Sequence, residues 1–456
     1  MTIVSLDLET LDDLLVGPVF AGGSAAAAAE AATFNLAVTH QPQLVVGAAV
    51  ADDVAVAVRF ATQHGLPVAV QATGHGPVRP ADGAVLITTS RMRAVSIDAA
   101  RRSARVEAGA RWREVIDAAA VHGLAPLCGS SSQVGVVGYT LGGGVGLLAR
   151  QYGFAADLVS RVELVTADGT LRVIDATSDP ELFWAVRGGK GNFGIVTAVE
   201  FGLVPVREIY AGSVFFDAAD ARDLLHAYRS WAPDLPERVT TSIAVLRLPP
   251  HEELPAPLRG RTVVHLRYAE AGGGDDAAEL LAPMLAAARP VLSVVGPMPF
   301  TAADAVHQDP TAPMPVYERG FGVRALPDSA IEAVLGAVAP GSDSPVAMIE
   351  IRQLGGALAR TPAVPNAVAG REAAYSIMLL GIRTPDTAAA LAVHAERLGA
   401  ELAPCGTGTA LLNFLGDATD PAAVARAWRP QDHARLLAVK RRVDPDNIFR
   451  FGHALV

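Results

Sequence analysis

The sequence predicts an α+β fold with two larger parts and a short carboxyl-terminal segment. Helix-like and strand-like segments alternate over residues 1–206, where the glycine clusters concentrate. From 207 to 404, alternating apolar runs between proline-rich connectors are typical of an antiparallel sheet, which we expect helices to cover. The pattern alone does not assign the last segment, 405–456, to either part. No repeat of fixed period is present, which excludes a solenoid or a propeller.

Individual helices and strands can be predicted from residue 52 onward, in all three parts of the chain. Apolar residues at helical spacing predict a helix from Asp52 to His64, with Asp52 or Asp53 as its cap and Gly65 as its stop. The other expected elements are strands at 68–70, 84–89 and 105–107, a helix at 112–121, a hairpin that pairs 162–166 with 171–174, later strands at 262–268 and 347–353, and a helix around 433–441 followed by a turn at 444–447.

Charge and composition exclude several classes of function. Hydrophobic residues make up 51% and charged residues 18% of the 456, which indicates a folded chain and not a disordered tail. With 37 basic and 47 acidic residues the net charge is −10, and no Lys/Arg block is present, so we expect no nucleic-acid partner. No apolar run approaches the roughly 20 residues of a membrane-spanning helix, so we expect no membrane partner.

Cysteine usage and the amino terminus indicate the compartment. Cys128 and Cys405 are too few for a disulfide framework or a four-ligand zinc site, so we expect a reducing environment and no metal. The first residues carry Asp7 and Glu9 and no basic residue, which does not fit a secretory signal. These observations predict a cytoplasmic protein.

Three glycine-rich segments interrupt the first part, and the first lies directly after a predicted strand. Gln71–Gly76 contains Gly-x-Gly, but Val78, Arg79 and Pro80 follow where a dinucleotide-binding fold begins a helix. A Rossmann site is therefore not expected. Such a loop can still present backbone N–H groups to an anion beside the imidazole of His75, although a solitary histidine is more often a plain hydrogen-bonded residue.

The second and third segments indicate close approach to a ligand. Gly129–Gly146 places glycines among valines and leucines, unlike a flexible polar linker, and a large flat ligand would need such backbone access. Arg187–Val196 contains Gly189 and Lys190, but Gly191 stands where a phosphate-binding loop needs Ser or Thr. An ATPase or kinase is therefore not expected.

Together, these segments resemble the FAD-binding domain of the vanillyl-alcohol oxidase superfamily, the PCMH type, and specifically its berberine bridge enzyme-like branch of covalent flavoprotein oxidases. The resemblance covers 42–205 and returns at 412–414 and 443–449, while Glu350–Ala357 is similar to that branch's substrate domain. It implies a two-subdomain FAD-binding domain at 1–206, a substrate domain with an antiparallel sheet at 207–404, and a segment at 405–456 that returns to the FAD domain.

The resemblance implies that FAD is bound covalently, through its 8α position, to His75. In this sequence Gln71, Ala72 and Thr73 replace the arginine and glycine that usually precede this histidine. A second covalent link through cysteine is not expected, because Ser131 occupies the matching position and Cys128 lies three residues too early. The expected cofactor-binding residues are Thr73, Gly74, His75, Gly76, Ser130, Ser131, Gly135, Gly138, Gly142, Gly143, Gly194, Ile195, Val196 and Asn447.

The same resemblance implies an oxidase of secondary metabolism, monomeric or homodimeric. It would transfer a hydride from an alcohol, amine, sugar or natural-product intermediate to FAD and pass the electrons to O2. Two alternatives stay open: a flavin-dependent dehydrogenase with another electron acceptor, and a flavin-holding binding protein without turnover.

The expected catalytic residues are Glu350, Tyr375, Asn413 and Tyr139, with Arg352 and Gln353 as further candidates in matching positions. Glu350 is either the base that removes the substrate proton or a structural partner of Arg352 or Arg371. The two tyrosines are either proton acceptors or ordinary half-buried side chains. Leu411 stands where many relatives carry a tyrosine, which leaves the identity of the base and the substrate class open.

Overall fold

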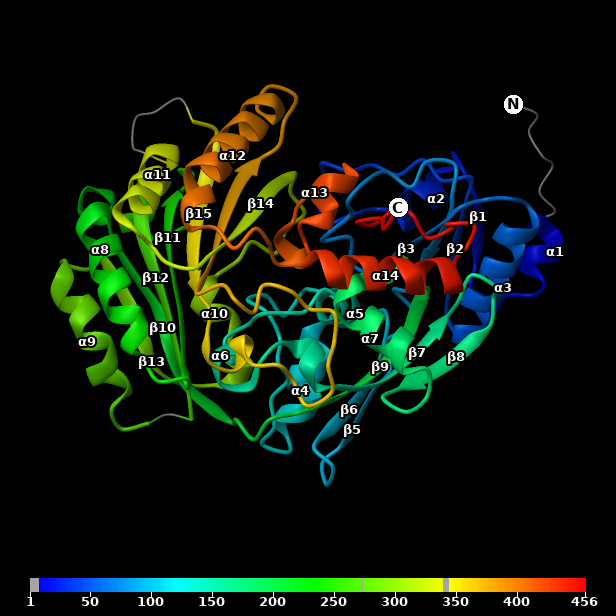
Figure 1. The fold of residues 1–456 in the computed structure, drawn as a ribbon, viewed down its shortest axis with the longest axis horizontal. Helices are drawn as coiled ribbons and strands as arrows, with labels where there is room; N and C mark the ends of the chain where they lie inside the picture. Colours follow the sequence, from blue (N-terminus) through cyan, green and yellow to red (C-terminus); the bar gives the residue numbers. More distant parts are fainter. Residues whose placement is uncertain (1–7, 273, 339–343) are drawn as a thin grey trace.

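Three β-sheets form the framework of the molecule, and each uses a separate stretch of the chain (Figure 1). The computed structural model describes residues 8–272, 274–338 and 344–456, so Asp7 of the acidic amino-terminal segment lies outside the described residues. Two sheets use strands that end by Gly202, and the third begins at Glu208. The mixed helices and sheets confirm the predicted fold class, whereas the proposed boundaries at 206/207 and 404/405 stay predictions.

The first sheet has four strands and three helices around it. Its three longer strands are parallel, and the first strand is antiparallel to its neighbour. The order is β1 (Val19–Ala21), β2 (Leu44–Gly47), β4 (Val85–Thr88) and β3 (Val68–Gln71). The accompanying helices are α1 (Leu8–Asp12), α2 (Ala25–Glu30) and α3 (Ala51–Gln63).

Helix α3 corrects the predicted cap. The helix begins at Ala51 with Val50 at the N-cap position, so neither Asp52 nor Asp53 is the N-cap residue. The Asp53 carboxylate instead lies inside the first turn and accepts the amides of Ala49, Val50, Val16 and Gly17 at 2.8–3.2 Å. Val16 and Gly17 lie in the loop before β1, so Asp53 ties that loop to the start of α3.

The second sheet is antiparallel and contains the predicted hairpin. Its order is β5 (Val95–Asp98), β6 (Ser103–Glu107), β9 (Ile195–Gly202), β7 (Val159–Val165) and β8 (Leu171–Asp175). Val162 pairs with Ile174, as the hairpin prediction requires. Around this sheet lie α4 (Trp112–Ala120), α5 (Val136–Leu141), α6 (Ala149–Tyr152) and α7 (Pro180–Gly189).

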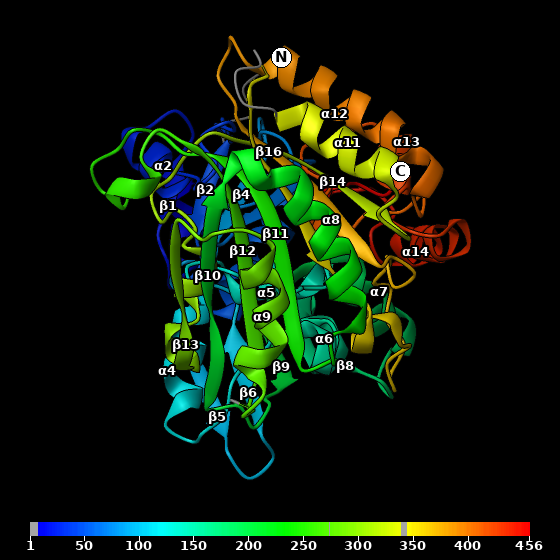
Figure 2. The same ribbon diagram turned by 90° about the vertical axis from the view of Figure 1, so that its left-hand side faces the viewer.

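The third sheet has seven antiparallel strands, as predicted for the middle of the chain. Its order is β13 (Leu292–Pro299), β10 (Glu208–Asp217), β12 (Thr262–Ala271), β11 (Val239–Arg247), β15 (Val346–Gln353), β16 (Tyr375–Ile382) and β14 (Val316–Val323). One face is covered by α8 (Ala221–Trp231), α9 (Ala277–Ala287), α11 (Asp328–Val338) and α12 (Ala388–Leu402), as Figure 2 shows.

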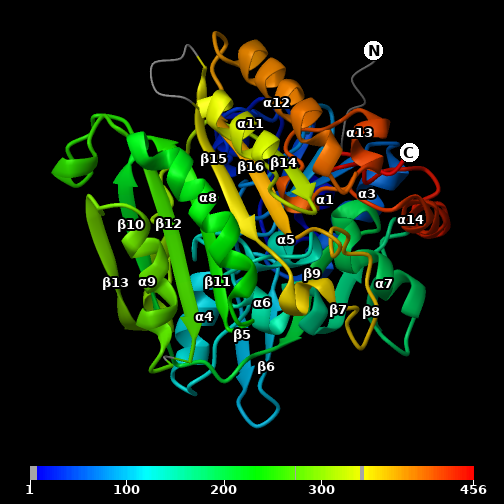
Figure 3. The ribbon, with the colours of Figure 1, turned by 60° about the vertical axis from the view of Figure 1, so that its left-hand side comes forward.

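Period-two alternation gives this sheet two chemically different faces. Ile349, Ile351 and Leu379 belong to the apolar core beneath the helices. Glu350 and Arg352, one residue out of phase, point to the opposite face, which is turned toward the glycine-rich part of the molecule (Figure 3). Buried charges on this face, between two parts of the protein, mark it as the place to look for chemistry.

The carboxyl-terminal segment packs against the first part. Helices α13 (Pro421–Ala425) and α14 (Pro430–Val443) lie beside the glycine-rich region in Figure 1. The ammonium of Lys440, which is 3% exposed, donates to the carbonyl oxygen of Asn192 at 2.9 Å, and the Asn192 amide donates to the carbonyl oxygen of His453 at 2.9 Å. Among the described residues, no helix has the length and apolar character to cross a membrane.

Candidate functional site

A cavity lies where the two larger parts and the carboxyl-terminal segment meet. His75 and Gly76 come from the first glycine segment, Lys190 from the third, and Glu318 from β14. The lining residues are Asn35, Val38, His75, Gly76, Pro77, Lys190, Val316, Tyr317, Glu318, Arg383, Asn413, Gly416, Asp417 and His453. Two of the predicted site residues distant in sequence, His75 and Asn413, are therefore brought to one cavity.

His75 has one ring nitrogen engaged and one without a protein partner. Its ring stacks on Phe34, with centroids 4.0 Å apart and planes 11° apart. Nδ1 forms a hydrogen bond of 2.8 Å with Thr73 Oγ1, whereas Nε2 has no hydrogen bond to any residue that the structure describes. Burial, with a smaller effect of Arg111, lowers the pKa of His75 to about 4, so the imidazole is neutral near pH 7.

Lys190 and Glu318 form a second titratable feature of this cavity. Burial lowers the pKa of Lys190 to about 8, against the attraction of Glu318. Burial also raises the pKa of Glu318 to about 7, opposed by Lys190 and reinforced by Asp417. Asp417 is itself paired with Arg383 at 2.7 Å. The cavity therefore holds two groups that change charge near neutral pH.

The three glycine segments pack closely against one another. A Cβ on Gly135 would lie 3.4 Å from Thr73 Oγ1, and a Cβ on Gly142 would lie 2.0 Å from Asn413 Oδ1 and 2.5 Å from the Lys190 Cε. Gly142 is thus required for the approach of Asn413, whose amide donates to the Tyr139 carbonyl oxygen at 2.8 Å. The space beside the Cα atoms of Gly76 and Gly138 is open.

Other predicted cofactor residues lie in or next to the same segments. Gly74 adopts a φ of +67° against Thr33, which only glycine tolerates easily. The amide of Gly143, an expected cofactor-binding residue, donates to the Thr140 carbonyl oxygen at 3.0 Å, so this donor is already used. Ser130 and Ser131 stand in the loop before α5, and the Ser131 hydroxyl accepts the Gln133 amide at 3.3 Å.

Strand β9 begins inside the third segment, and its first two residues pair with a neighbouring strand on one side. Gly194 packs against the Val165 carbonyl, and Ile195 and Val196 pair with β7 on one side. On the other side the pairing with β6 reaches only Ala198. Asn447 lies in the predicted turn, with a φ of +51°, but is not among the residues that line the cavity.

Unsatisfied buried polar atoms test whether these residues fit FAD. Buried groups without a hydrogen-bond partner are rare in folded proteins and indicate a missing ligand or water. Such atoms occur here at Arg79 Nε, Tyr139 Oη, Thr140 Oγ1, Asn447 Oδ1 and His453 Nδ1. Other such atoms lie elsewhere, for example at Gln151 and on the third sheet, but His453 lines the cavity, and a cofactor with phosphate and ring heteroatoms supplies partners of the kind that these atoms lack. The residues present therefore fit FAD.

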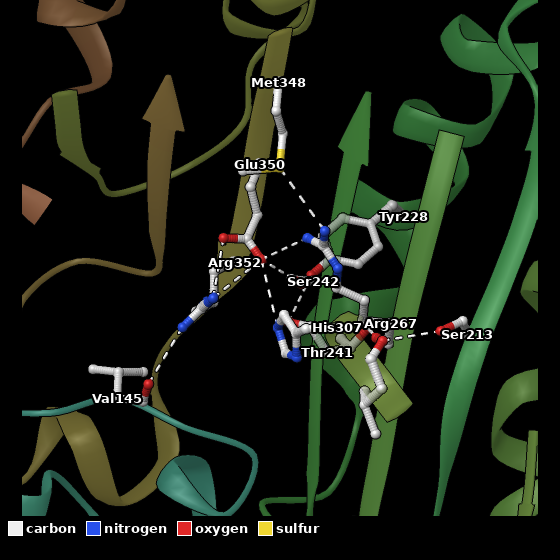
Figure 4. A network of polar contacts seen from close by, with 11 residues as sticks. Val145, Ser213, Tyr228, Thr241, Ser242, Arg267, His307, Met348, Glu350 and Arg352 are labelled. Carbon is white, nitrogen blue, oxygen red and sulfur yellow. Dashed lines mark hydrogen bonds and ion pairs between the residues drawn. The ribbon is translucent and has the colours of Figure 1, made fainter. Parts of the chain in front are cut away.

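A polar network occupies the neighbouring face of the third sheet (Figure 4). Glu350 Oε1 accepts the Ser242 hydroxyl at 2.7 Å and Arg267 at 2.9 Å, and Arg352 lies 3.1 Å from Oε2. Arg352 also donates to the carbonyl oxygen of Val145, in the second glycine segment, at 3.3 Å. Although burial opposes it, Arg352 and Arg267 hold the pKa of Glu350 well below its usual range.

This network narrows the roles predicted for Glu350. The ion pair with Arg352 is observed, but Arg371 instead pairs with Asp157 at 2.6 Å, so the alternative pairing with Arg371 is wrong. A carboxylate that accepts three donors and has a lowered pKa is a weak proton acceptor. The geometry therefore favours the structural alternative for Glu350 over the role of base.

The two tyrosine candidates occupy different environments. Tyr375 and Gln353 lie opposite each other on the helix-covered face, where Tyr375 packs 6.4 Å from the ring of Tyr228. That face is turned away from Glu350 and Arg352, which argues against contact of Tyr375 or Gln353 with a substrate. Tyr139 lies beside Gly129 and Gly144, and burial raises its pKa well above the usual value.

Arg267, His307 and Glu318 line the two sites although no motif singled them out, and Lys190 lines the first although the sequence suggested only a phosphate-binding loop for it. His307 lies at the end of α10 (Asp304–His307), with neither ring nitrogen hydrogen-bonded and Nε2 3.8 Å from Glu350 Oε1. The signal for Arg267 was in the sequence, because a charge interrupts the apolar run of a strand that was predicted. No comparable signal marks His307.

Comparison with known proteins identifies the family. A family model described as "FAD binding domain" matches residues 42–175, and one described as "Berberine and berberine like" matches 412–455. The chain is 31% identical over 435 residues to (R)-6-hydroxynicotine oxidase of Paenarthrobacter nicotinovorans, covering 91% of each chain.

Solved structures agree with this match. The crystal structure of 6-hydroxy-D-nicotine oxidase from Arthrobacter nicotinovorans gives a TM-score of 0.81 at 26% identity, over 97% of this chain and 98% of that one. BBE-like 1 of Physcomitrella patens shares the fold with a TM-score of 0.85 at 22% identity, over 98% and 99% of the two chains. Sequence motifs, cavity, family models and full-length relatives agree, and the chain is an enzyme of the berberine bridge enzyme-like family of FAD-linked oxidoreductases.

Proposed function

We propose that the protein is an oxidase that carries FAD on His75 and uses O2 as its electron acceptor. Its substrate is a small molecule with a hydroxyl or amine on the carbon that is oxidised. The observation that carries the proposal is the free Nε2 of His75 at a cavity that both family-model regions line. A relative that this chain matches over nearly its whole length is named an oxidase, which supports the choice of O2 over another electron acceptor.

The contacts of His75 support Nε2 as the linking atom. When Nδ1–H donates to Thr73 Oγ1, the Nε2 lone pair is free, and stacking on Phe34 fixes the ring plane. The lowered pKa keeps this nitrogen unprotonated and nucleophilic at neutral pH. A link at Nε2 would replace one C–H bond of the 8α methyl group by an N–C bond, and the proton on Nδ1 would leave, so that Nδ1 would then accept the Thr73 hydroxyl. The two hydrogens, with two electrons, would pass to O2 as H2O2.

The chain's own groups then position the substrate and handle its proton. When bound, FAD supplies the acceptor for the substrate hydride. Asn413, held by its bond to the Tyr139 carbonyl, and Lys190 and Glu318 at the same cavity are polar groups in position to orient a hydroxyl or amine. Glu318, with a pKa raised to about 7, is better matched than Glu350 to exchange a proton near neutral pH.

Acid precipitation tests the link. The protein is denatured in acid and pelleted, and flavin absorbance is measured in the pellet and the supernatant. We expect a yellow pellet from the native protein, and free or absent flavin from His75→Ala. The matched control is His122→Ala, at an exposed histidine in a turn, which should leave the pellet yellow. Flavin released from the native protein would disprove the covalent link.

Reoxidation separates the oxidase from its alternatives. After anaerobic reduction by dithionite, an oxidase should regain its oxidised flavin spectrum within seconds of mixing with air, with one H2O2 formed per flavin. Slow reoxidation in air would indicate a dehydrogenase. A flavin that no alcohol, amine or sugar bleaches in an anaerobic screen would favour a binding protein without turnover.

A further inference from the structure

A second, buried cavity on the polar face of the third sheet is rich in hydrogen-bond donors. Arg267, His307 and Arg352 line it together with hydroxyl side chains of β11, among them Thr240. Gly146, from the second glycine segment, forms part of the same wall. The cavity therefore lies between the substrate sheet and the part of the chain that fits FAD.

The donors of this cavity exceed the acceptors that the protein provides. Glu350 is paired with both guanidinium groups, and its oxygens are already engaged. Arg267, which is 3% exposed, has no partner for Nε, and its second terminal nitrogen contacts only the Met348 sulfur at 3.8 Å. Both ring nitrogens of His307 are buried without a partner, and because burial lowers the pKa of His307 well below its usual value, one of them carries an N–H donor and the other a lone pair. Donors left unpaired in this way are costly unless a ligand or an ordered water accepts them.

The charges around this cavity also favour an acidic ligand. Two guanidinium groups face one carboxylate in hydrogen-bond contact, and Asp309 acts on Arg352 only through space. A protonated amine placed here would meet like charges, whereas a carboxylate would bring the missing acceptors and the missing negative charge. Arginine side chains are also well shaped to hold carboxylates by paired hydrogen bonds.

We propose that this cavity binds a carboxylate of the substrate, so that the enzyme oxidises an organic acid that also carries the reacting hydroxyl or amine. The proposal rests on the proposed function and adds a substrate class to it. Arg267 and His307 contact the carboxylate, while Glu350 holds Arg267 and Arg352 in place. The bond from Arg352 to the Val145 carbonyl ties this anchor to the glycine segment that fits the cofactor.

Ligand titration of the flavin-loaded enzyme tests the proposal. Acetate, propionate and benzoate are each compared with the matching amide at constant ionic strength, and binding is followed by the visible flavin spectrum and by the melting temperature. We expect at least one carboxylate to bind ten-fold or more tightly than its amide. If no carboxylate is preferred to its amide, the proposal is wrong.

Two arginine variants locate the binding. Arg267→Gln should weaken the preferred carboxylate at least ten-fold and leave the binding of its amide unchanged, and Arg267→Lys should retain part of the preference. The matched control is Arg360→Gln, at an exposed ion pair with Glu237, which should not change either affinity. Unchanged carboxylate binding in Arg267→Gln would overturn the proposal even if the wild type prefers carboxylates.

The same preparations separate this proposal from the two other possibilities. If Arg267→Gln lowers the flavin content and leaves carboxylate affinity per bound flavin unchanged, the free donors face the cofactor and the substrate proposal fails. The acid pellet assay reports the covalent link independently, because it needs no substrate or carboxylate. A colourless pellet with a strong carboxylate preference would therefore disprove the histidyl link alone.

Discussion

Individual glycines distinguish tight packing inside the protein from space left for a ligand. Gly142 and Gly76 both stand in motifs that sequence analysis assigned to FAD, yet their surroundings differ. A side chain on Gly142 would collide with Asn413, whereas one on Gly76 would enter open space at the cavity. The sequence cannot make this distinction, because the colliding atoms come from residues that lie far away along the chain.

Gly76→Ala provides a test of where FAD lies. Because nothing lies within 4 Å of the added methyl group, we expect the variant to fold normally. If the cofactor occupies this space, the methyl group should lower the ratio of FAD to protein in the purified enzyme by at least two-fold. The ratio is measured from visible and ultraviolet absorbance.

The control for this variant is Gly336→Ala, because Gly336 also has open space but lies in α11, on the outer side of the third sheet. Alanine favours a helix by about 1 kcal/mol over glycine, so this variant should keep its flavin and unfold at an equal or higher temperature. Equal flavin ratios in Gly76→Ala and in the wild type would place FAD elsewhere.

Among helices and strands, those with a local sequence pattern were predicted, whereas the pairing of strands distant in sequence was not. Helix α3 and the β7–β8 hairpin were expected from spacing and turn residues, whereas the three-residue β1 and the short α5 inside a glycine segment give no periodic signal. Parity in β15 already separates Gln353 from Glu350 and Arg352. The placement of Tyr375 needed the β15–β16 register, which depends on pairing across the sheet.

The buried ammonium of Lys440 joins α14 to the first part through the Asn192 carbonyl oxygen at 2.9 Å, and to the turn that follows the helix. The Lys440 ammonium reaches the Asp444 carboxylate at 2.6 Å and the Phe449 carbonyl at 2.8 Å, and the same carboxylate accepts the amides of Ile448 and Phe449. Lys440→Met removes the countercharge and leaves Asp444 buried. We expect the free energy of unfolding to fall by about 3–5 kcal/mol, measured by urea denaturation.

The control for the α14 anchor is Arg360→Met, which breaks an ion pair with Glu237 at 2.6 Å in which both side chains are about half exposed. Exposed pairs contribute about 0–1 kcal/mol, so the urea midpoint should change little. If Lys440→Met is no more destabilising than Arg360→Met, the buried pair does not anchor the helix.

For the whole molecule, the site is assembled from segments that the sequence keeps apart. Motif resemblance found His75 and Asn413 because each lies in a local pattern with a known role. For Lys190 the sequence suggested only a phosphate-binding loop, which was rejected. Glu318 lies in a strand that was not predicted individually. Their importance comes from the closure of three parts around one cavity, which no local pattern encodes.

The burial of several titratable side chains also makes the stability of the fold depend on pH. Seven histidines have pKa values below their usual range, among them the buried His265, His307 and His453. A histidine with a lowered folded pKa stabilises the fold fully above about pH 6.5, and this contribution is lost as the pH falls toward the folded pKa. Glu318, with a raised pKa of about 7, contributes oppositely, because its stabilisation is lost as the pH rises through that value.

His453→Gln isolates one of these groups. Burial, helped by Lys190, lowers the pKa of His453 to about 3, so between pH 7 and pH 5 the unfolded chain takes up a proton that the folded chain does not. Glutamine can still donate to the Gly416 carbonyl, which His453 Nε2 contacts at 2.8 Å. The loss of unfolding free energy between pH 7 and pH 5 should therefore be about 2 kcal/mol smaller in the variant than in the wild type. Urea denaturation at the two pH values measures it, with the exposed His122→Gln as control, and an identical loss in all three proteins would show that His453 is protonated in the folded state.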